Sequence, residues 1–327
     1  MANCVIPWWR KPNPSAIWKK GCSGRKLYDD TCGNCPGIRE LILALELLDS
    51  RQLMEPRLFL ALAFIPAALL AQQPDAQEIV RRSVAVATAD WNAAPNYSFV
   101  EHDTVTKHGG PTSKTYEVLM IEGSPYNKLI AVNGRPLSPG EQADEDRKLQ
   151  QEIQKRKRES PSARARRIAK YQRERQQDHA MMMEMADAFN FKLTGSEKVD
   201  GHDTWVLEAT PKPGYQPRTR DTKVLTGMKG KLWVDKEQYH WVKVEAEVFK
   251  PVSFYGFLAK VGPGTRFVLE NEPVAGNVWL PKHFAVKVNS TALGFINHDS
   301  CTDETYRDYQ PNAKALALVA ARAPAGQ

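Results

Sequence analysis

The sequence predicts a mainly β fold of the α+β class. We expect one large antiparallel sheet, which must curl, close or be covered, and a long charged helical insertion. Strand-like segments follow one another through the second half of the chain, turn residues connect them, and no helix-length pattern separates them. The clearest segment is residues 230–250, where a short polar stretch joins two alternating runs into a hairpin.

The alternation in this hairpin predicts one apolar face. Successive side chains of a strand point to opposite sides, so residues of one parity share a face. The apolar parity consists of Leu232, Val234, Val242, Val244, Ala246 and Val248. Trp241 and the charged residues between the valines have the opposite parity. An antiparallel sheet with one apolar face needs a cover over that face.

Composition sets the scale of the protein. The chain has 327 residues, of which 42% are hydrophobic and 25% are charged, which suits one large domain or two small ones. The net charge is +7, and many of the basic residues gather in residues 140–187.

Residues 54–71 have the pattern of a secretory signal peptide. Arg57 precedes an apolar run over 58–70, and the small residue Ala71 ends it. The run is shorter than a membrane span and contains Pro66, although a buried helix or an anchor remains an alternative. The next residue is Gln72, so no cysteine follows for lipid attachment. This pattern predicts a soluble, exported protein.

Residues 1–53 carry four of the five cysteines, and Cys32 and Cys35 have the C-x-x-C spacing of zinc or redox sites. A zinc ribbon needs a second such pair and a thioredoxin-like site needs a βαβ context, and neither is present. The favoured interpretation is an upstream extension from a misassigned start codon, which we expect to be disordered. The mature chain then contains a single cysteine, Cys301.

The first half of the mature chain combines a helix, three strands and the insertion. Residues 75–91 have helical spacing of apolar residues, and residues 96–106, 115–122 and 126–132 are strand-like. In residues 140–187 we expect two helices divided at Pro161, with Ser160 as a cap. The basic runs indicate either a surface for anionic lipid headgroups or nucleic acid, or a solvated insertion. The methionines of residues 181–185 cover an apolar opening or belong to the core.

The second half is expected to be sheet. The predicted strands are residues 189–199, 203–210, 231–235, 239–250, 265–272, 282–291 and 301–309. Residues 251–264 form either a short buried turn or strand, or a mobile apolar gate whose residues are Phe254, Tyr255, Phe257 and Leu258. Residues 313–327 are expected to be a flexible tail, with a short or frayed helix over 313–323.

The sequence contains no recognisable catalytic or metal motif. The seven histidines lack metal-ligand spacing, and there is no nucleophile elbow, phosphate-binding loop or dinucleotide fingerprint. We therefore predict a protein that is not an enzyme and has no cofactor and no metal.

Three segments carry a family resemblance. The run G-x-L-W-V-D at residues 230–235, with the alternating strand after it, resembles the outer-membrane lipoprotein-sorting, LolA/LolB-like superfamily. Residues 201–208 and 304–309 resemble two further strands of that superfamily, and the resemblance covers about residues 75–309 within a predicted domain of 72–312. It implies one large, curved antiparallel sheet, an unclosed barrel, with helices packed on its concave side. It also implies a protein that carries lipoprotein acyl chains or binds other hydrophobic ligands. The insertion at 140–187 departs from the pattern.

These observations lead to a functional hypothesis. We expect a non-catalytic periplasmic carrier for an amphiphile such as a lipid or lipoprotein acyl chain, with membrane-surface contact through the basic insertion and no nucleic-acid partner. The alternative is an envelope regulatory or scaffolding protein with a filled core that binds a protein partner. The predicted cavity residues are Trp205, Leu207, Leu232, Val234, Val242, Val244, Val248, Phe267, Leu269, Phe284 and Val286.

Overall fold

The computed structural model describes residues 74–107, 110–254, 259–292 and 296–322. All of them belong to one of the two compact units of the chain. The expected upstream extension and signal peptide lie outside the described residues.

The described strands form one antiparallel sheet of thirteen strands. Its order is β4-β3-β2-β1-β13-β12-β11-β8-β7-β6-β5, with β9 and β10 attached beside β12. Because β4 and β5 are the two ends of this order, the sheet is not closed, as the resemblance implies. The strands are β1 (Tyr97–Lys107), β2 (Gly110–Ile121), β3 (Ser124–Val132), β4 (Arg135–Pro136), β5 (Phe189–Val199), β6 (His202–Pro211), β7 (Met228–Asp235), β8 (Trp241–Val248), β9 (Val252–Ser253), β10 (Ala259–Val261), β11 (Arg266–Ala275), β12 (Val278–Ala292) and β13 (Ile296–Pro311).

One long-range pairing joins the two ends of the chain. β1 lies between β2 and β13, so the first and last described strands are neighbours. The local connections are tight turns: Asn133 and Gly134, and Asp200 and Gly201, all have positive φ. Asn, Asp and Gly tolerate this conformation best, which is why the turn signals are readable in the sequence.

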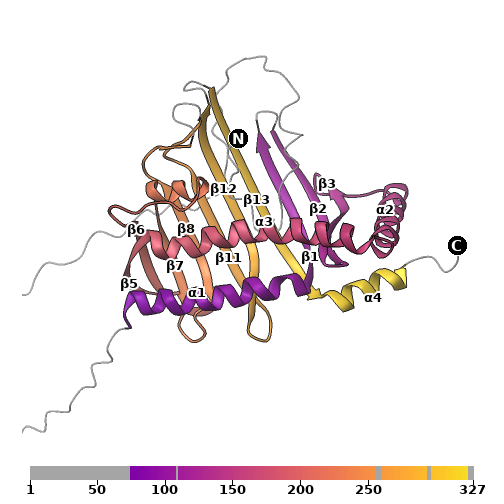
Figure 1. The fold of residues 1–327 in the computed structure, drawn as a ribbon, viewed down its shortest axis with the longest axis horizontal. Helices are drawn as coiled ribbons and strands as arrows, with labels where there is room; N and C mark the ends of the chain where they lie inside the picture. The colour runs from indigo at the N-terminus through magenta and orange to yellow at the C-terminus, as the bar shows by residue number, and fades with distance from the viewer. Residues whose placement is uncertain (1–73, 108–109, 255–258, 293–295, 323–327) are drawn as a thin grey trace, which may run out of the picture. The chain divides into compact units, whose positions relative to one another are not determined.

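Two long helices lie across the same face of the sheet, α1 (Ala76–Ala93) and α3 (Pro161–Ala188) (Figure 1). α1 buries Ile79, Val80, Val84 and Ala87 against strand residues of the sheet. A short 3-10 helix, η2 (Ala94–Asn96), includes Pro95 and leads into β1. The predicted helix over 75–91 is therefore confirmed.

The charged insertion consists of α2 (Pro139–Lys157) and α3. Pro161 is at the start of α3, and the Ser160 hydroxyl accepts a hydrogen bond from the Ala163 backbone N–H, as predicted. Ser138 and Glu141 form a capping box at the start of α2. Arg156 and Arg167 then fasten the helix pair to the sheet, because both donate hydrogen bonds into the β2–β3 turn.

Of the two expectations for residues 313–322, a short helix or a frayed end, the structure has the helix. These residues belong to α4 (Asn312–Arg322), where Ala315 is only 1% exposed and packs against Leu119, Ile121 and Leu149. Asn312 accepts a hydrogen bond from Ser98 and donates one to the Pro95 carbonyl, which ties the start of α4 to the start of β1. Small side chains allow such close packing, so an Ala-rich segment need not be a free end.

Candidate functional site

The apolar face of the sheet is built from aligned rows of side chains. Five predicted cavity residues stand directly opposite one another on β6, β7, β8, β11 and β12, and form the first row: Leu207, Leu232, Val244, Leu269 and Phe284. Trp205 and Val234 form part of a neighbouring row. Antiparallel pairing aligns residues of one parity across strands, so these side chains share the face covered by α1 and α3.

A bulge in β8 changes the predicted parity of one residue. Val234 pairs with Trp241 and Trp233 pairs with Lys243, so Val242 is the extra residue between them. Two consecutive residues of a bulged strand then oppose one residue of the partner. Trp241 consequently packs with Leu232 and Val234 under α1, whereas Val242 packs with Val206, Trp233 and Trp279 in a separate cluster. Val242 is therefore wrong as a cavity residue, and Trp241 was missed.

A second row explains why the face is hollow. Ala209, Gly230 and Ala246 are opposite one another on β6, β7 and β8, followed by Phe267 and Val286 on β11 and β12. The three smallest residues in this row leave a depression beside the bulky first row. Gly230 has no space for a side chain, since an added Cβ would lie 2.3 Å from the Glu245 carbonyl oxygen.

An apolar cleft lies over this depression. It contains about 530 Å³ that protein atoms do not fill, a figure that includes the part open to solvent. Ala209, Gly230 and Ala246 line it from the sheet, together with Leu232, Val244 and Trp241. Its other lining residues include Val80 and Val84 of α1, Met185 and Ala186 of α3, Phe189 and Phe191 of β5, and Leu225 of η3 (Asp221–Gly227).

Other predicted residues are arranged around the cleft. Phe267 and Leu269 pack against the cluster under α1, and Phe284 and Val286 continue the apolar face in a neighbouring cluster. Val248 is buried and pairs with Met228, one of the lining residues. A second apolar pocket of about 370 Å³ lies farther along α3, lined by Tyr171 with residues of β1, β2 and β12.

The proposed gate is only partly described. Phe254 is half-buried, and Tyr255, Phe257 and Leu258 lie outside the described residues. On either side of them, β9 and β10 pair with each other, and β10 pairs with β12. The described parts of residues 251–264 therefore include short strands, which was the alternative to a gate.

α1 is fastened to the sheet by buried polar contacts. The Trp241 indole N–H donates to the Ser83 hydroxyl over 3.0 Å. Asp90 accepts a hydrogen bond from the Trp279 backbone N–H and lies 2.7 Å from Nδ1 of His240, which is fully buried. His240 in turn stacks on Trp279. These contacts join α1 to two hairpins of the sheet, and the spacing of the histidines gave no signal for them.

The C-terminal end of α3 is held mainly by one buried carboxylate. Glu184, which is 2% exposed, accepts hydrogen bonds from the Tyr215 hydroxyl and, over 2.7 Å, from the Arg218 backbone N–H. Burial and the neighbouring Glu184 raise the pKa of the Tyr215 hydroxyl, so it remains a donor. These bonds fix the loop before η3 against α3 and complete the cover of the cleft.

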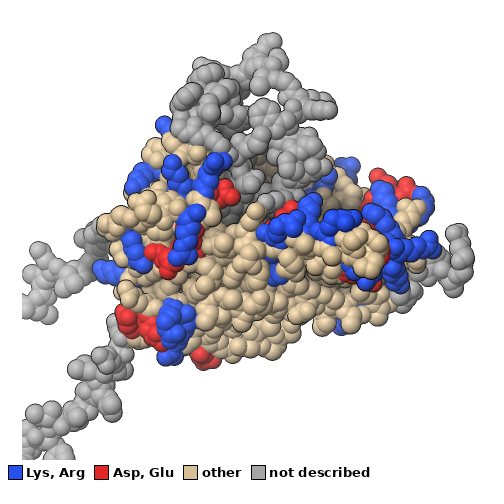
Figure 2. Space-filling model, viewed as in Figure 1, with Lys and Arg blue, Asp and Glu red and all other residues tan. Residues whose placement is uncertain are grey.

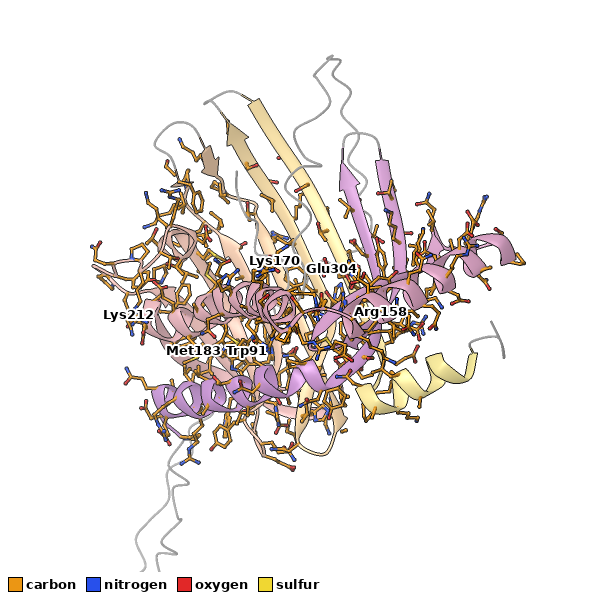
Figure 3. All side chains as sticks on the ribbon, turned by 45° about the vertical axis from the view of Figure 1, so that its right-hand side comes forward. Trp91, Arg158, Lys170, Met183, Lys212 and Glu304 are labelled. Carbon is orange, nitrogen blue, oxygen red and sulfur yellow. The ribbon has the colours of Figure 1, made fainter. Side chains whose placement is uncertain are left out.

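Trp91 of α1 lies beside α3 (Figure 3), and two side chains of α3 cover it. The Arg175 guanidinium carbon lies 4.0 Å from the centre of the Trp91 ring, and its side chain donates to the Trp91 carbonyl oxygen. The His179 ring stacks on Trp91 with 4.3 Å between ring centres. Burial and the nearby Arg175 charge lower the pKa of His179. The apolar cleft is therefore flanked by a compact cationic and aromatic contact.

The apolar face ends in buried acidic residues. Glu304 is opposite Phe284, and Glu304 and Glu101 are 2% and 0% exposed. The Tyr306 hydroxyl donates to Glu304, and burial together with that carboxylate holds the pKa of Tyr306 well above its usual range. Within the described part of the chain, no group of histidine, cysteine and acidic residues has the arrangement of a metal site. None of the described helices combines the length and apolar character needed to cross a membrane.

Comparison with known proteins finds similarity only among solved structures. No protein-family profile and no curated protein sequence matches the chain. A LolA superfamily protein from Nitrosomonas europaea is 13% identical, with 73% of this chain and 94% of that chain covered and a TM-score of 0.29. An outer membrane lipoprotein-sorting protein domain from Vibrio parahaemolyticus is 14% identical, with 72% and 97% covered and a TM-score of 0.28.

A third similar structure is the MucA/MucB complex from Pseudomonas aeruginosa. Its matched chain is 11% identical, with 73% of this chain and 99% of that chain covered and a TM-score of 0.20. The superfamily that the sequence resembles is thus represented among the similar structures. Identities and TM-scores this low do not transfer a ligand or a partner to this chain.

Proposed function

We propose that this chain is a non-catalytic, periplasmic carrier or binding protein for an amphiphile, whose acyl chain enters the cleft between α1, α3 and strands β5–β8. The partners in this proposal are lipids or lipoprotein acyl chains, with contact to a membrane surface through the basic insertion. The observation that carries it is the apolar lining of the cleft over the small residues Ala209, Gly230 and Ala246. Each buried methylene group contributes roughly 0.8 kcal/mol, so an acyl chain gains affinity with length.

The cleft has to widen for a long acyl chain, and the contacts indicate which side widens. α1 is fastened by the bonds of Ser83 and Asp90 to the sheet. The α3 side contributes Met185 and Ala186, and η3 contributes Leu225. Methionine side chains are flexible and adapt to different shapes. We therefore assign the movable cover to the end of α3 together with η3 and the loop before it, which the Glu184 bonds join into one unit that we expect to move as a whole.

The test is displacement of a fluorescent fatty acid, with native mass spectrometry of co-purified lipid. The variant Ala246→Leu places a larger side chain over Gly230 and should weaken fatty-acid binding at least tenfold. The matched control is Ala285→Leu, because Ala285 lies between Phe284 and Val286 and points to the opposite face of the sheet. Absence of fatty-acid binding by the unaltered protein, or equal binding by both variants, would contradict the proposal.

A second candidate is the regulatory or scaffolding protein. It is favoured by the side chains that already occupy the apolar face, since Ile79 of α1 is 0% exposed and Val80 is 5% exposed. If side chains fill the apolar face of the sheet, the protein should not bind the fluorescent fatty acid and should instead form a stable complex with a protein partner. The fatty-acid experiment therefore separates the two candidates.

A further inference from the structure

α3 has two chemically different faces. Tyr171, Arg175 and His179 are buried at i, i+4 and i+8 and point toward the sheet and α1. Arg166, Lys170 and Arg173 are exposed, at i, i+4 and i+7, and lie together on the opposite side of the helix. The helix that covers the cleft thus carries a row of cations on its outer surface.

These outward cations differ from the others of the insertion. In α2 the cations are paired along the helix, as in Arg147 with Asp144 at 2.7 Å and Lys148 with Glu145 at 2.7 Å. Lys155 is likewise paired with Glu152. By contrast, Arg166, Lys170 and Arg173 form no ion pair with any described residue. Paired charges largely offset each other, so α2 presents little net charge, whereas the outer face of α3 presents three positive charges that no ion pair among the described residues offsets.

The cationic row lies on the same side of the protein as the cleft cover. Figure 2 shows Lys and Arg gathered over the half of α3 nearest α2, in the view that has α1 and α3 in front of the sheet. Lys157 and Arg158, exposed at the end of α2, extend the row, and Figure 3 shows Arg158 and Lys170 on this side. A flat anionic surface could contact all of these residues at once.

We propose that the outer face of α3, defined by Arg166, Lys170 and Arg173, docks on an anionic phospholipid surface. This deepens the proposed function, on which it rests, because it places α3, whose C-terminal end contributes Met185 and Ala186 to the cleft, against the source or destination of the acyl chain. A nucleic acid is the weaker candidate occupant. Between and beyond the cations the outer face carries Ala169, Gln176 and Ala180, and offers no aromatic side chain on which a base could stack.

Attraction between the three cations and the anionic lipids sets the expected change in membrane affinity. Each Lys or Arg near an anionic membrane strengthens binding by on the order of fivefold, so loss of three weakens it by about 100-fold. Because salt screens exposed charges, binding should also fall as the ionic strength rises.

The experiment is flotation of the full chain with lipid vesicles. We expect binding to vesicles that contain phosphatidylglycerol and none to vesicles of phosphatidylcholine alone. The triple variant Arg166→Gln, Lys170→Gln, Arg173→Gln should lose about 100-fold in vesicle affinity. The matched control is Arg147→Gln, Lys148→Gln, Lys155→Gln, which removes the same charge from α2 and should retain binding. Salt titration of the unaltered protein gives a second measurement that needs no variant.

Three outcomes would overturn the docking proposal: equal loss in both triple variants, equal binding to the two kinds of vesicle, or equal affinity for duplex DNA at the same ionic strength. The fatty-acid assay distinguishes failure of the docking proposal from failure of the proposed function. The α3 triple variant should still bind the fluorescent fatty acid with unchanged affinity, because its altered residues do not line the cleft. Loss of vesicle binding with fatty-acid binding retained is the expected pair of results.

Discussion

Gly230 and Ala246 face each other on β7 and β8, and an added Cβ at Gly230 would lie 2.3 Å from the Glu245 carbonyl oxygen. Backbone cannot withdraw from such a contact without disturbing the sheet. The position therefore requires glycine, and Gly230 lines the cleft as one of the three small residues of its row.

Gly230→Ala should therefore destabilise the protein by about 1–3 kcal/mol, the usual cost of overpacking a buried site. The measurement is the free energy of unfolding in urea. Gly195→Ala is the matched control, since Gly195 is also in a strand but an added Cβ there meets nothing within 4 Å. Equal stability of the two variants would contradict the assigned packing of β7 against β8.

The bond between Tyr215 and Glu184 should stabilise the cover of the cleft. Tyr215→Phe removes a hydrogen bond to a buried carboxylate and should cost about 2 kcal/mol in unfolding free energy. Amide hydrogen exchange should increase first in the loop before η3, because Glu184 then retains only the Arg218 backbone N–H on that loop. Tyr171→Phe is the control, as no hydrogen bond joins that hydroxyl to a described residue. Unchanged exchange in the Tyr215→Phe variant would show that the bond does not hold the loop.

Loss of the proton from His283 should make the protein less stable in alkaline solution. The Asp303 carboxylate, 3.0 Å from Nε2 of His283, and the Glu270 carboxylate, 3.6 Å from its Nδ1, raise the pKa of His283 from 6.5 to about 9. A raised pKa in the folded state means that the stabilisation is complete below pH 6.5 and is lost as the pH rises through about 9. His283→Gln should remove this slope from the unfolding free energy measured across that range. A variant with the same slope as the unaltered protein would assign the pH dependence to other groups.

Protonation of His179 should lower the stability of the protein in acid, in contrast to the alkaline effect of His283. Burial and Arg175 lower the pKa of His179, so the folded state resists protonation that the unfolded chain accepts. Stability should fall as the pH drops below the unfolded-state value of 6.5. His179→Phe keeps an aromatic ring on Trp91 and should lessen that acid-induced loss. The comparison uses urea unfolding at a series of pH values, and an unchanged acid slope in the variant would refute the assignment.

Much of the fold is readable in the sequence because its signals are local. Ser160 and Pro161 mark the start of α3, since a hydroxyl cap and a proline suit the first turn of a helix. The Asn133–Gly134 and Asp200–Gly201 turns need positive φ, which these residues tolerate. Alternation placed Leu232, Val234 and Val244 on one face without knowledge of their neighbours.

The candidate site depended on contacts that local patterns do not contain. The bulge at Val242 arises from the pairing of β7 with β8, and it moves Trp241 under α1 although strict alternation predicts the reverse. The tie from Asp90 to His240 likewise joins residues that are far apart in the sequence.

The sequence by itself determined the order of the elements, the helix caps, the turns and the apolar character of one sheet face, because each follows from residues close together in the chain. Only the tertiary structure decided that Ala209, Gly230 and Ala246 align across three strands and that α3 covers the hollow they leave. Register between strands and the docking of a helix are set by packing between distant segments, so no local pattern encodes them.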